Sequence, residues 1–188
     1  IALTNPSDSF VTFDEDTVRD IGIQFGDPDS NTPVNDLELL SSSTNPSLIP
    51  PAPTGVEFSR LAGSSSATAE LRPVQDGFGS NVVSLIVRRA DGAQSSVLVT
   101  NIVTPVNDLP VISRLTDKAT DENKAVTFTF LISDVDTPPN DLRAEAFSDN
   151  PTLIADTSLT LFNLTTKVGS LPNTTLDFPL FPNAGQHG

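Results

Sequence analysis

The sequence contains no cysteine, methionine, tryptophan or tyrosine, and its single histidine is His187. Without cysteine, disulfides, thiolate nucleophiles and thiolate metal sites are all excluded. The position of His187, next to the last residue, favours a loop residue over a general base. Phenylalanine supplies all the aromatic content, which disfavours carbohydrate binding on stacked tryptophan or tyrosine platforms. No apolar run approaches the roughly 18 residues that a membrane span needs.

Basic residues are also scarce, with 10 lysines and arginines against 24 acidic residues and a formal net charge of −14. Such a surface repels nucleic acid and anionic membranes and concentrates cations at carboxylate clusters. We therefore expect neither a nucleic-acid partner nor membrane insertion of this segment. The serine runs at 41–43 and 64–66 are typical of loops and lack the motif of a nucleophile elbow.

What the sequence does contain is an internal repeat with a period of 105 to 107 residues. The first copy has the landmarks Phe13-Asp14-Glu15-Asp16, Asp27-Pro28-Asp29, Asn35-Asp36-Leu37 and Asn45-Pro46-Ser47-Leu48-Ile49-Pro50. The second has Thr120-Asp121-Glu122-Asn123, Asp134-Val135-Asp136, Asn140-Asp141-Leu142 and Asn150-Pro151-Thr152-Leu153-Ile154-Ala155. The period is the size of one β-sandwich module, so we interpret the repeat as a duplication. Because the acidic residues recur with the module, they favour architecture over a unique active site, and we expect no enzyme.

Apolar residues alternate with a period of two within each copy, as in half-buried strands. We expect strands at 18–25 and 126–132, with further strands around 83–87 and 176–180. No segment shows a helical period. The sequence therefore predicts an all-β chain of two tandem Greek-key β-sandwich modules, residues 1–104 and 105–188. The linker at 104–110 has two prolines, which predict a short and stiff junction.

The second module is expected to lack its last two strands. Pro182 and Gly188 match Pro73 and Gly79, and the two β-rich segments that follow in the first copy, 81–89 and 95–103, have no counterpart. An incomplete sandwich exposes apolar residues and open sheet edges, which pair readily with other chains. We expect residues after Gly188 or strands of a neighbouring molecule to fill that edge, with residues 1–4 as one candidate donor.

The junction Pro105-Val106-Asn107-Asp108-Leu109-Pro110 resembles that of bacterial cadherin-like and Ig-like tandem repeats of large extracellular surface proteins. Asp121-Glu122-Asn123 is similar to the first-strand Pro-Glu-Asn of those modules, and Asp134-Val135-Asp136 is similar to their Asp-x-Asp. The resemblance implies a cadherin- or Ig-like fold, an extracellular location and calcium ligation by the matching acidic residues.

Calcium takes six to eight oxygen ligands from carboxylates, amide side chains and carbonyls. The candidate metal ligands at the junction are Glu15, Asn107, Asp108, Asp134, Asp136 and Asn140. The matching set Asp27, Asp29 and Asn35 would face a preceding repeat, and Glu122 a following one. The alternative is that these residues only shape turns, since Asp and Asn side chains cap backbone groups.

The leading hypothesis is a non-catalytic structural or adhesive segment of an extracellular surface or filament protein. It would space neighbouring modules, with calcium as a stiffener at the junction. Its partners would be neighbouring repeats, other copies of itself, a glycan or a surface receptor. Two alternatives remain: an accessory polysaccharide-binding region of a secreted hydrolase, and a filament subunit that polymerises by strand exchange. Asn163 and Asn173 begin glycosylation sequons.

Overall fold

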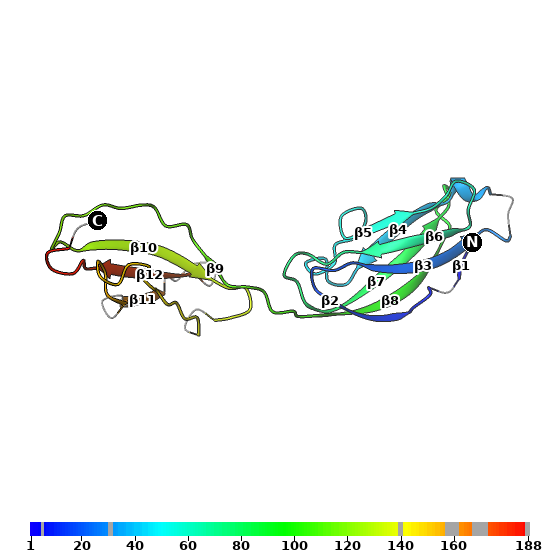
Figure 1. Cartoon of the computed structure of the whole chain (residues 1–188). Helices are drawn as coiled ribbons and strands as arrows, with labels where there is room; N and C mark the ends of the chain where they lie inside the picture. Colours follow the sequence, from blue (N-terminus) through cyan, green and yellow to red (C-terminus); the bar gives the residue numbers. More distant parts are fainter. Residues whose placement is uncertain (5, 30–31, 139–140, 157–161, 167–172, 187–188) are drawn as a thin grey trace. The chain divides into compact units, whose positions relative to one another are not determined.

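The computed structural model describes the chain except for residues 5, 30–31, 139–140, 157–161, 167–172 and 187–188. It divides into two compact units, residues 1–106 and 107–188 (Figure 1). Strands dominate both, and the one helical element among the described residues is a 3-10 turn, η1, at Val34–Asp36. The prediction of an all-β chain is confirmed.

The first unit is a sandwich of two four-stranded sheets (Figure 1). Its strands are β1 (Ala2–Thr4), β2 (Phe10–Asp14), β3 (Arg19–Gly26), β4 (Glu38–Ser43), β5 (Val56–Ser59), β6 (Ser66–Leu71), β7 (Gly79–Arg88) and β8 (Gln94–Thr104). One sheet has the order β1-β3-β6-β5 and the other β2-β8-β7-β4. All neighbours are antiparallel except β2 and β8, which run parallel. This is the Greek-key strand order of immunoglobulin-type sandwiches.

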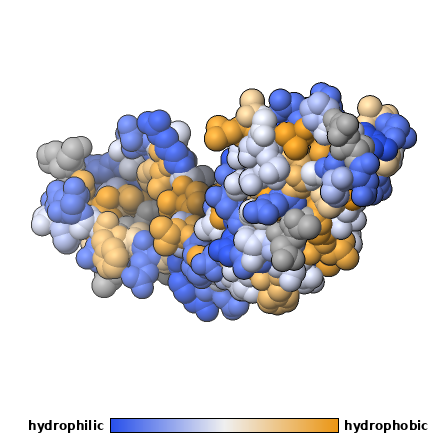
Figure 2. Space-filling model, turned by 90° about the vertical axis from the view of Figure 1, so that its right-hand side faces the viewer, coloured by the Kyte–Doolittle hydropathy of each residue, from blue (hydrophilic) through white to orange (hydrophobic). Residues whose placement is uncertain are grey.

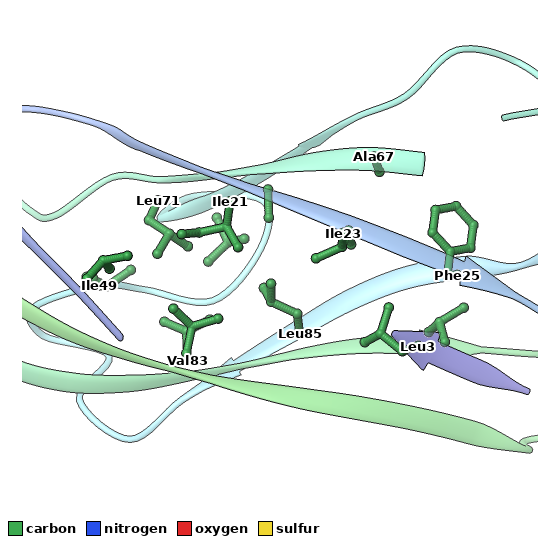
Figure 3. Close-up of a cluster of buried hydrophobic side chains, with 14 of the residues drawn as sticks. Leu3, Ile21, Ile23, Phe25, Ile49, Ala67, Leu71, Val83 and Leu85 are labelled. Atoms are coloured by element: carbon green, nitrogen blue, oxygen red, sulfur yellow. The ribbon is translucent and has the colours of Figure 1, made fainter. Parts of the chain in front are cut away.

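Alternation along the strands builds the core of this sandwich. In β3, Ile21, Ile23 and Phe25 are buried while the residues between them face solvent. The facing sheet contributes buried residues of β7 and β8. Figure 3 shows Val83 and Leu85 of β7 across the core from Ile21 and Ile23 of β3. Each fully buried Val, Leu or Ile stabilises the fold by roughly 1.5–3 kcal/mol relative to an exposed one.

One buried polar residue joins two strands of the second sheet at their ends. Asn81 of β7 accepts hydrogen bonds at Oδ1 from Thr44 Oγ1 (3.0 Å), the Asn45 backbone N–H (3.1 Å) and Ser43 Oγ (3.3 Å). These three groups follow or end β4, which pairs with β7. Asn81 therefore fixes the path by which the chain leaves β4.

The second unit contains one four-stranded sheet in the part of the chain that the structure describes. Its strands are β9 (Val111–Ile112), β10 (Val126–Ser133), β11 (Phe162–Thr166) and β12 (Asn173–Leu180), in the order β11-β12-β10-β9. This order repeats β5-β6-β3-β1 of the first unit. The central pair also keeps its register, since Phe128 opposes Phe178 as Ile21 opposes Ala69.

The turn before β3 in the first unit has the same backbone conformation as the turn before β10 in the second unit. Asp16 and Asn123 occupy matching positions and both have a left-handed backbone, with φ of 58° and 60°. Asp and Asn tolerate this conformation better than most side chains. The repeat read from the sequence is therefore a structural repeat.

The second unit departs from the expected module in two further segments. Residues 117–121 and 143–148 correspond to β2 and β4, yet neither forms a strand. In the first unit β2 pairs with β8 and β4 pairs with β7. Strand conformation at these two segments depends on a partner strand, and no described residue of the second unit supplies one.

The expectation that residues 1–4 serve as a donor strand is wrong in this structure. Ala2, Leu3 and Thr4 form β1, which pairs antiparallel with β3 of the same unit. Leu3 is buried in the first core. This segment completes its own sheet and is not available to the second unit.

Candidate functional site

Glu15 holds the end of the first unit in place. It follows β2, and its backbone N–H donates to the Thr104 carbonyl at the end of β8 (2.9 Å). Its side chain is 3% exposed, and Oε1 accepts the Val106 N–H at 2.8 Å. Oε2 is also buried, and no hydrogen-bond partner for it exists among the described residues. A buried carboxylate oxygen without a partner is costly, so this oxygen is a good candidate ligand for a cation.

The Asp134-Val135-Asp136 loop follows β10 in the second unit. Asp134 is buried, and its Oδ1 accepts the N–H groups of Asp136 (2.9 Å) and Thr137 (2.8 Å). Asp136 is exposed, and its Oδ2 accepts the Asp108 N–H at 2.6 Å. The loop therefore combines turn chemistry with a direct hydrogen bond to the linker.

Backbone hydrogen bonds link three of the six candidate ligands: the Asp108 N–H donates to Asp136 Oδ2, and the Asp136 N–H donates to Asp134 Oδ1. Beside them, Asn107 donates its side-chain amide to the Asp108 carbonyl at 2.5 Å. Glu15 belongs to the first unit. Asn140 lies outside the described residues. The sequon residues Asn163 and Asn173 lie in β11 and β12.

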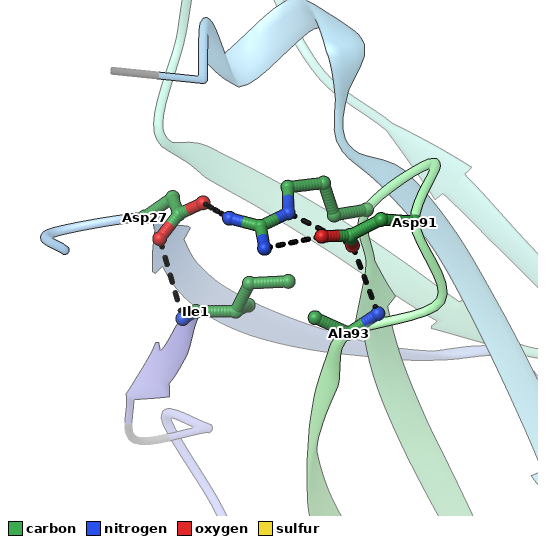
Figure 4. Close-up of polar contacts among 5 residues, drawn as sticks. Ile1, Asp27, Asp91 and Ala93 are labelled. Carbon is green, nitrogen blue, oxygen red and sulfur yellow. Dashed lines mark hydrogen bonds and ion pairs between the residues drawn. The ribbon is translucent and has the colours of Figure 1, made fainter. Parts of the chain in front are cut away.

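The repeat counterpart of Asp134 has a different partner. Asp27 Oδ2 accepts a hydrogen bond from Arg89 Nη1 at 2.9 Å, and its Oδ1 lies 3.3 Å from the amino group of Ile1 (Figure 4). Arg89 also binds Asp91 through two bonds, Nε to Oδ1 at 2.9 Å and Nη2 to Oδ2 at 2.5 Å. At this end of the first unit, a guanidinium neutralises the carboxylate that the motif suggested for calcium.

The paired charges shift the acid–base properties of both groups. The hydrogen bonds from Arg89 and from the Ala93 backbone N–H lower the pKa of Asp91 to about 2, while Asp91 and then Asp27 raise the pKa of Arg89 above its usual range. A carboxylate with a lowered pKa stabilises the fold only while it is ionised.

We expect the Asp91→Asn variant to lose a pH-dependent contribution to stability. Unfolding returns Asp91 to an ordinary pKa of 3.8, so the contribution is fully present above that value and disappears as pH falls through about 2. Urea unfolding of both proteins between pH 2 and 7 measures it, and the gap in unfolding free energy should close toward low pH. Arg89→Gln should flatten the same part of the profile. Parallel curves down to pH 2 would contradict the assignment.

An open groove of about 850 Å³ lies on the outer side of the β1-β3-β6-β5 sheet. Hydroxyl side chains such as Ser7, Ser59 and Thr68, the amide of Gln24 and the guanidinium of Arg60 line it together with the apolar residues Ile23, Leu61 and Ala67. None of the described lining residues is aromatic or acidic.

Apolar residues also reach the surface of the first unit. Phe10 and Leu98 are mostly exposed on the outer side of the β2-β8-β7-β4 sheet, and Figure 2 shows hydrophobic patches interrupted by hydrophilic residues on the face it presents. No helix in the described part of the chain has the length and apolar character to cross a bilayer.

No protein-family model and no curated protein matches the chain. Similar solved structures include the crystal structure of Dpr2 Ig1-Ig2 in complex with DIP-Theta Ig1-Ig3, at 13% identity over 93% of this chain and 83% of that chain, with a TM-score of 0.35. Another is the anomalous substructure of Titin-A168169, at 10% identity over 90% and 78% of the two chains, with a TM-score of 0.32. At these TM-scores neither supports an argument about this chain, so the immunoglobulin-type sandwich rests on the strand order of the first unit.

Proposed function

We propose that the chain is a non-catalytic structural segment of an extracellular surface protein of the cadherin-like or Ig-like kind, which spaces neighbouring modules. The observation that carries this proposal is the double attachment of the linker. Val106 N–H binds Glu15 of the first unit, and Asp108 N–H binds Asp136 of the second. Only Asn107 separates the two attached residues, so little free chain remains at the junction to act as a hinge.

Calcium is proposed as the stiffener of this junction. The buried and unpartnered Oε2 of Glu15 and the carboxylates of Asp108, Asp134 and Asp136 are the hard oxygen donors that calcium prefers. The net charge of −14 favours cation uptake, and carboxylates gathered at the junction would repel one another without the metal. The metal would reduce this repulsion and hold the linker against both attachment points.

Distance measurements between spin labels test both parts of the proposal. Because the chain has no cysteine, Ser96→Cys in β8 and Leu131→Cys in β10 place one label on each unit. A spacer predicts one narrow distance distribution in the presence of calcium and a broader one in chelator. Calcium at one hundred times its Kd should also raise the free energy of unfolding by about 2.7 kcal/mol.

Substitutions distinguish the contribution of the metal to the stiffness of the junction from that of the linker. Glu15→Gln and Asp134→Asn should abolish the calcium effect, whereas Glu122→Gln, the exposed repeat counterpart of Glu15, should retain it. A narrow distance distribution that chelator does not change would overturn the proposal of a calcium site but would be consistent with the proposed spacer function. A broad distribution under both conditions would overturn the spacer itself.

A further inference from the structure

The inner side of the sheet in the second unit is only partly covered. Phe130, Ile132 and Leu142 form a small core in which Phe130 remains 6% exposed. Phe128, Ala144, Ala146 and Leu180 pack against it and are half-buried. This is an apolar surface for which the first unit provides a direct template.

In the first unit, the β7–β8 hairpin covers the equivalent surface. Ile21, Ile23 and Phe25 of β3 correspond by repeat position to Phe128, Phe130 and Ile132 of β10. They share one core with the hairpin residues Val83, Leu85, Val87, Val99 and Val103, all of which are essentially inaccessible to solvent. The residues that would lie opposite β10 are therefore specified by type and spacing: apolar side chains, mostly Val, at alternate positions of two antiparallel strands.

The two segments that flank this hairpin in the first unit are both present in the second. Residues 143–148 correspond to β4, and residues 117–121 correspond to β2. In the first unit these strands pair with β7 and β8, one on each side of the hairpin. Leu142, Ala144 and Ala146 already pack against the apolar side of the sheet although their segment forms no strand.

A cavity of about 330 Å³ lies on the same side of the sheet. Polar residues of the 118–122 segment line part of it, and its apolar lining includes Val126 and Phe128 of β10, Leu180 of β12, and Leu153 and Ile154. The counterparts of the last two in the first unit, Leu48 and Ile49, are fully buried in the sandwich core, whereas Leu153 and Ile154 are half-exposed. The space therefore marks core volume that the described residues of the second unit leave unfilled.

We propose that the β11-β12-β10-β9 sheet is an acceptor surface for a two-stranded β-hairpin of the β7–β8 pattern. The first strand of the hairpin pairs antiparallel with residues 143–148, and the second pairs parallel with residues 117–121. Alternate Val and Leu side chains of the hairpin face Phe128, Phe130 and Ile132 and fill the cavity. This inference concerns the second unit alone and does not depend on the spacer function or on calcium.

The repeat supplies its own test. Gly188 matches Gly79 in sequence position, so a second copy of residues 80–104 joined directly after Gly188 places the hairpin in register. In this extended chain, we expect the backbone amides of Phe128, Phe130 and Ile132 to exchange with solvent at least about tenfold more slowly than in the original chain. Residues 143–148 should acquire strand chemical shifts at the same time.

A matched pair of variants in the added copy distinguishes insertion from nonspecific contact. Val83→Asp with Leu85→Asp changes the inward residues and should abolish the protection, whereas Ser84→Asp with Ser80→Asp changes the outward ones and should preserve it. Equal protection from both pairs, or none from the unmodified copy, would overturn the proposal. Sedimentation of the original chain tests whether a second copy of the chain covers the sheet instead. A dimer in which the β10 amides are already protected from exchange would show that it does, and would overturn the proposal.

Discussion

Replacement of Leu85 by alanine is expected to lower the free energy of unfolding of the first unit by about 2–5 kcal/mol. Leu85 is 0% exposed and lies at the centre of β7, between the two sheets. The substitution removes its apolar contacts and leaves a cavity that two hydrogen-bonded sheets cannot easily collapse around. Urea unfolding of the full chain, monitored by a signal that reports on the first unit, measures the decrease in the free energy of unfolding.

Leu98→Ala is the matched control on the neighbouring strand. Leu98 lies on β8 but points to the outer side of the sheet and is 61% exposed. Its truncation should change the unfolding free energy by no more than about 0.5 kcal/mol, as at most surface positions. If both substitutions cost the same, the inward and outward sides of this sheet have been assigned wrongly.

Asn81→Ala is expected to cost about 2–4 kcal/mol, although it removes a polar side chain. The substitution leaves the Thr44 hydroxyl and the Asn45 N–H without their acceptor in a part-buried environment. An unsatisfied buried donor loses its full desolvation free energy, about 1–3 kcal/mol each, which exceeds the small gain from burying an alanine. Equilibrium unfolding measures the total change in the free energy of unfolding. Hydrogen exchange of the Asn45 amide shows whether the structure is destabilised locally at that residue.

Two comparison variants narrow the cause. Ser80→Ala, at the exposed neighbouring position on β7, should be almost neutral. Asn81→Asp retains an acceptor oxygen but loses the hydrogen bond that Nδ2 donates to Ser43 Oγ. Above the carboxyl pKa, it should lower the free energy of unfolding less than Asn81→Ala does. If alanine and aspartate destabilise equally, the acceptor bonds are not the source of the effect.

The strands were predictable wherever alternation was strong. The expected strands at 18–25 and 126–132 match β3 and β10 within one residue. These strands each bury one face, and burial of one face imposes a period of two that is visible in a single sequence. The sandwich class followed from the same alternation together with the repeat length.

Features that depend on distant partners were not predictable. The ion pair of Arg89 with Asp27 joins residues 62 positions apart, and no local pattern distinguishes this aspartate from Asp134. Likewise, residues 117–121 and 143–148 have the sequence positions of strands, but no described residue of the second unit supplies the partner that strand pairing requires. For the candidate site, the motif identified Glu15 and the Asp134–Asp136 loop, whereas the bond from Glu15 to the linker at Val106 became visible only in three dimensions.

The parallel pairing of β2 with β8 gives the first unit a direction of mechanical resistance. Phe10 to Asp14 lie beside Thr100 to Thr104 in register, and β8 leads directly into the linker. A pull on the chain before β2 and after β8 drags these parallel strands in opposite directions along their own axes. Their hydrogen bonds are then loaded together in shear and cannot open one at a time from an end. Tension along a chain of such modules would therefore meet its main resistance at this pair of strands.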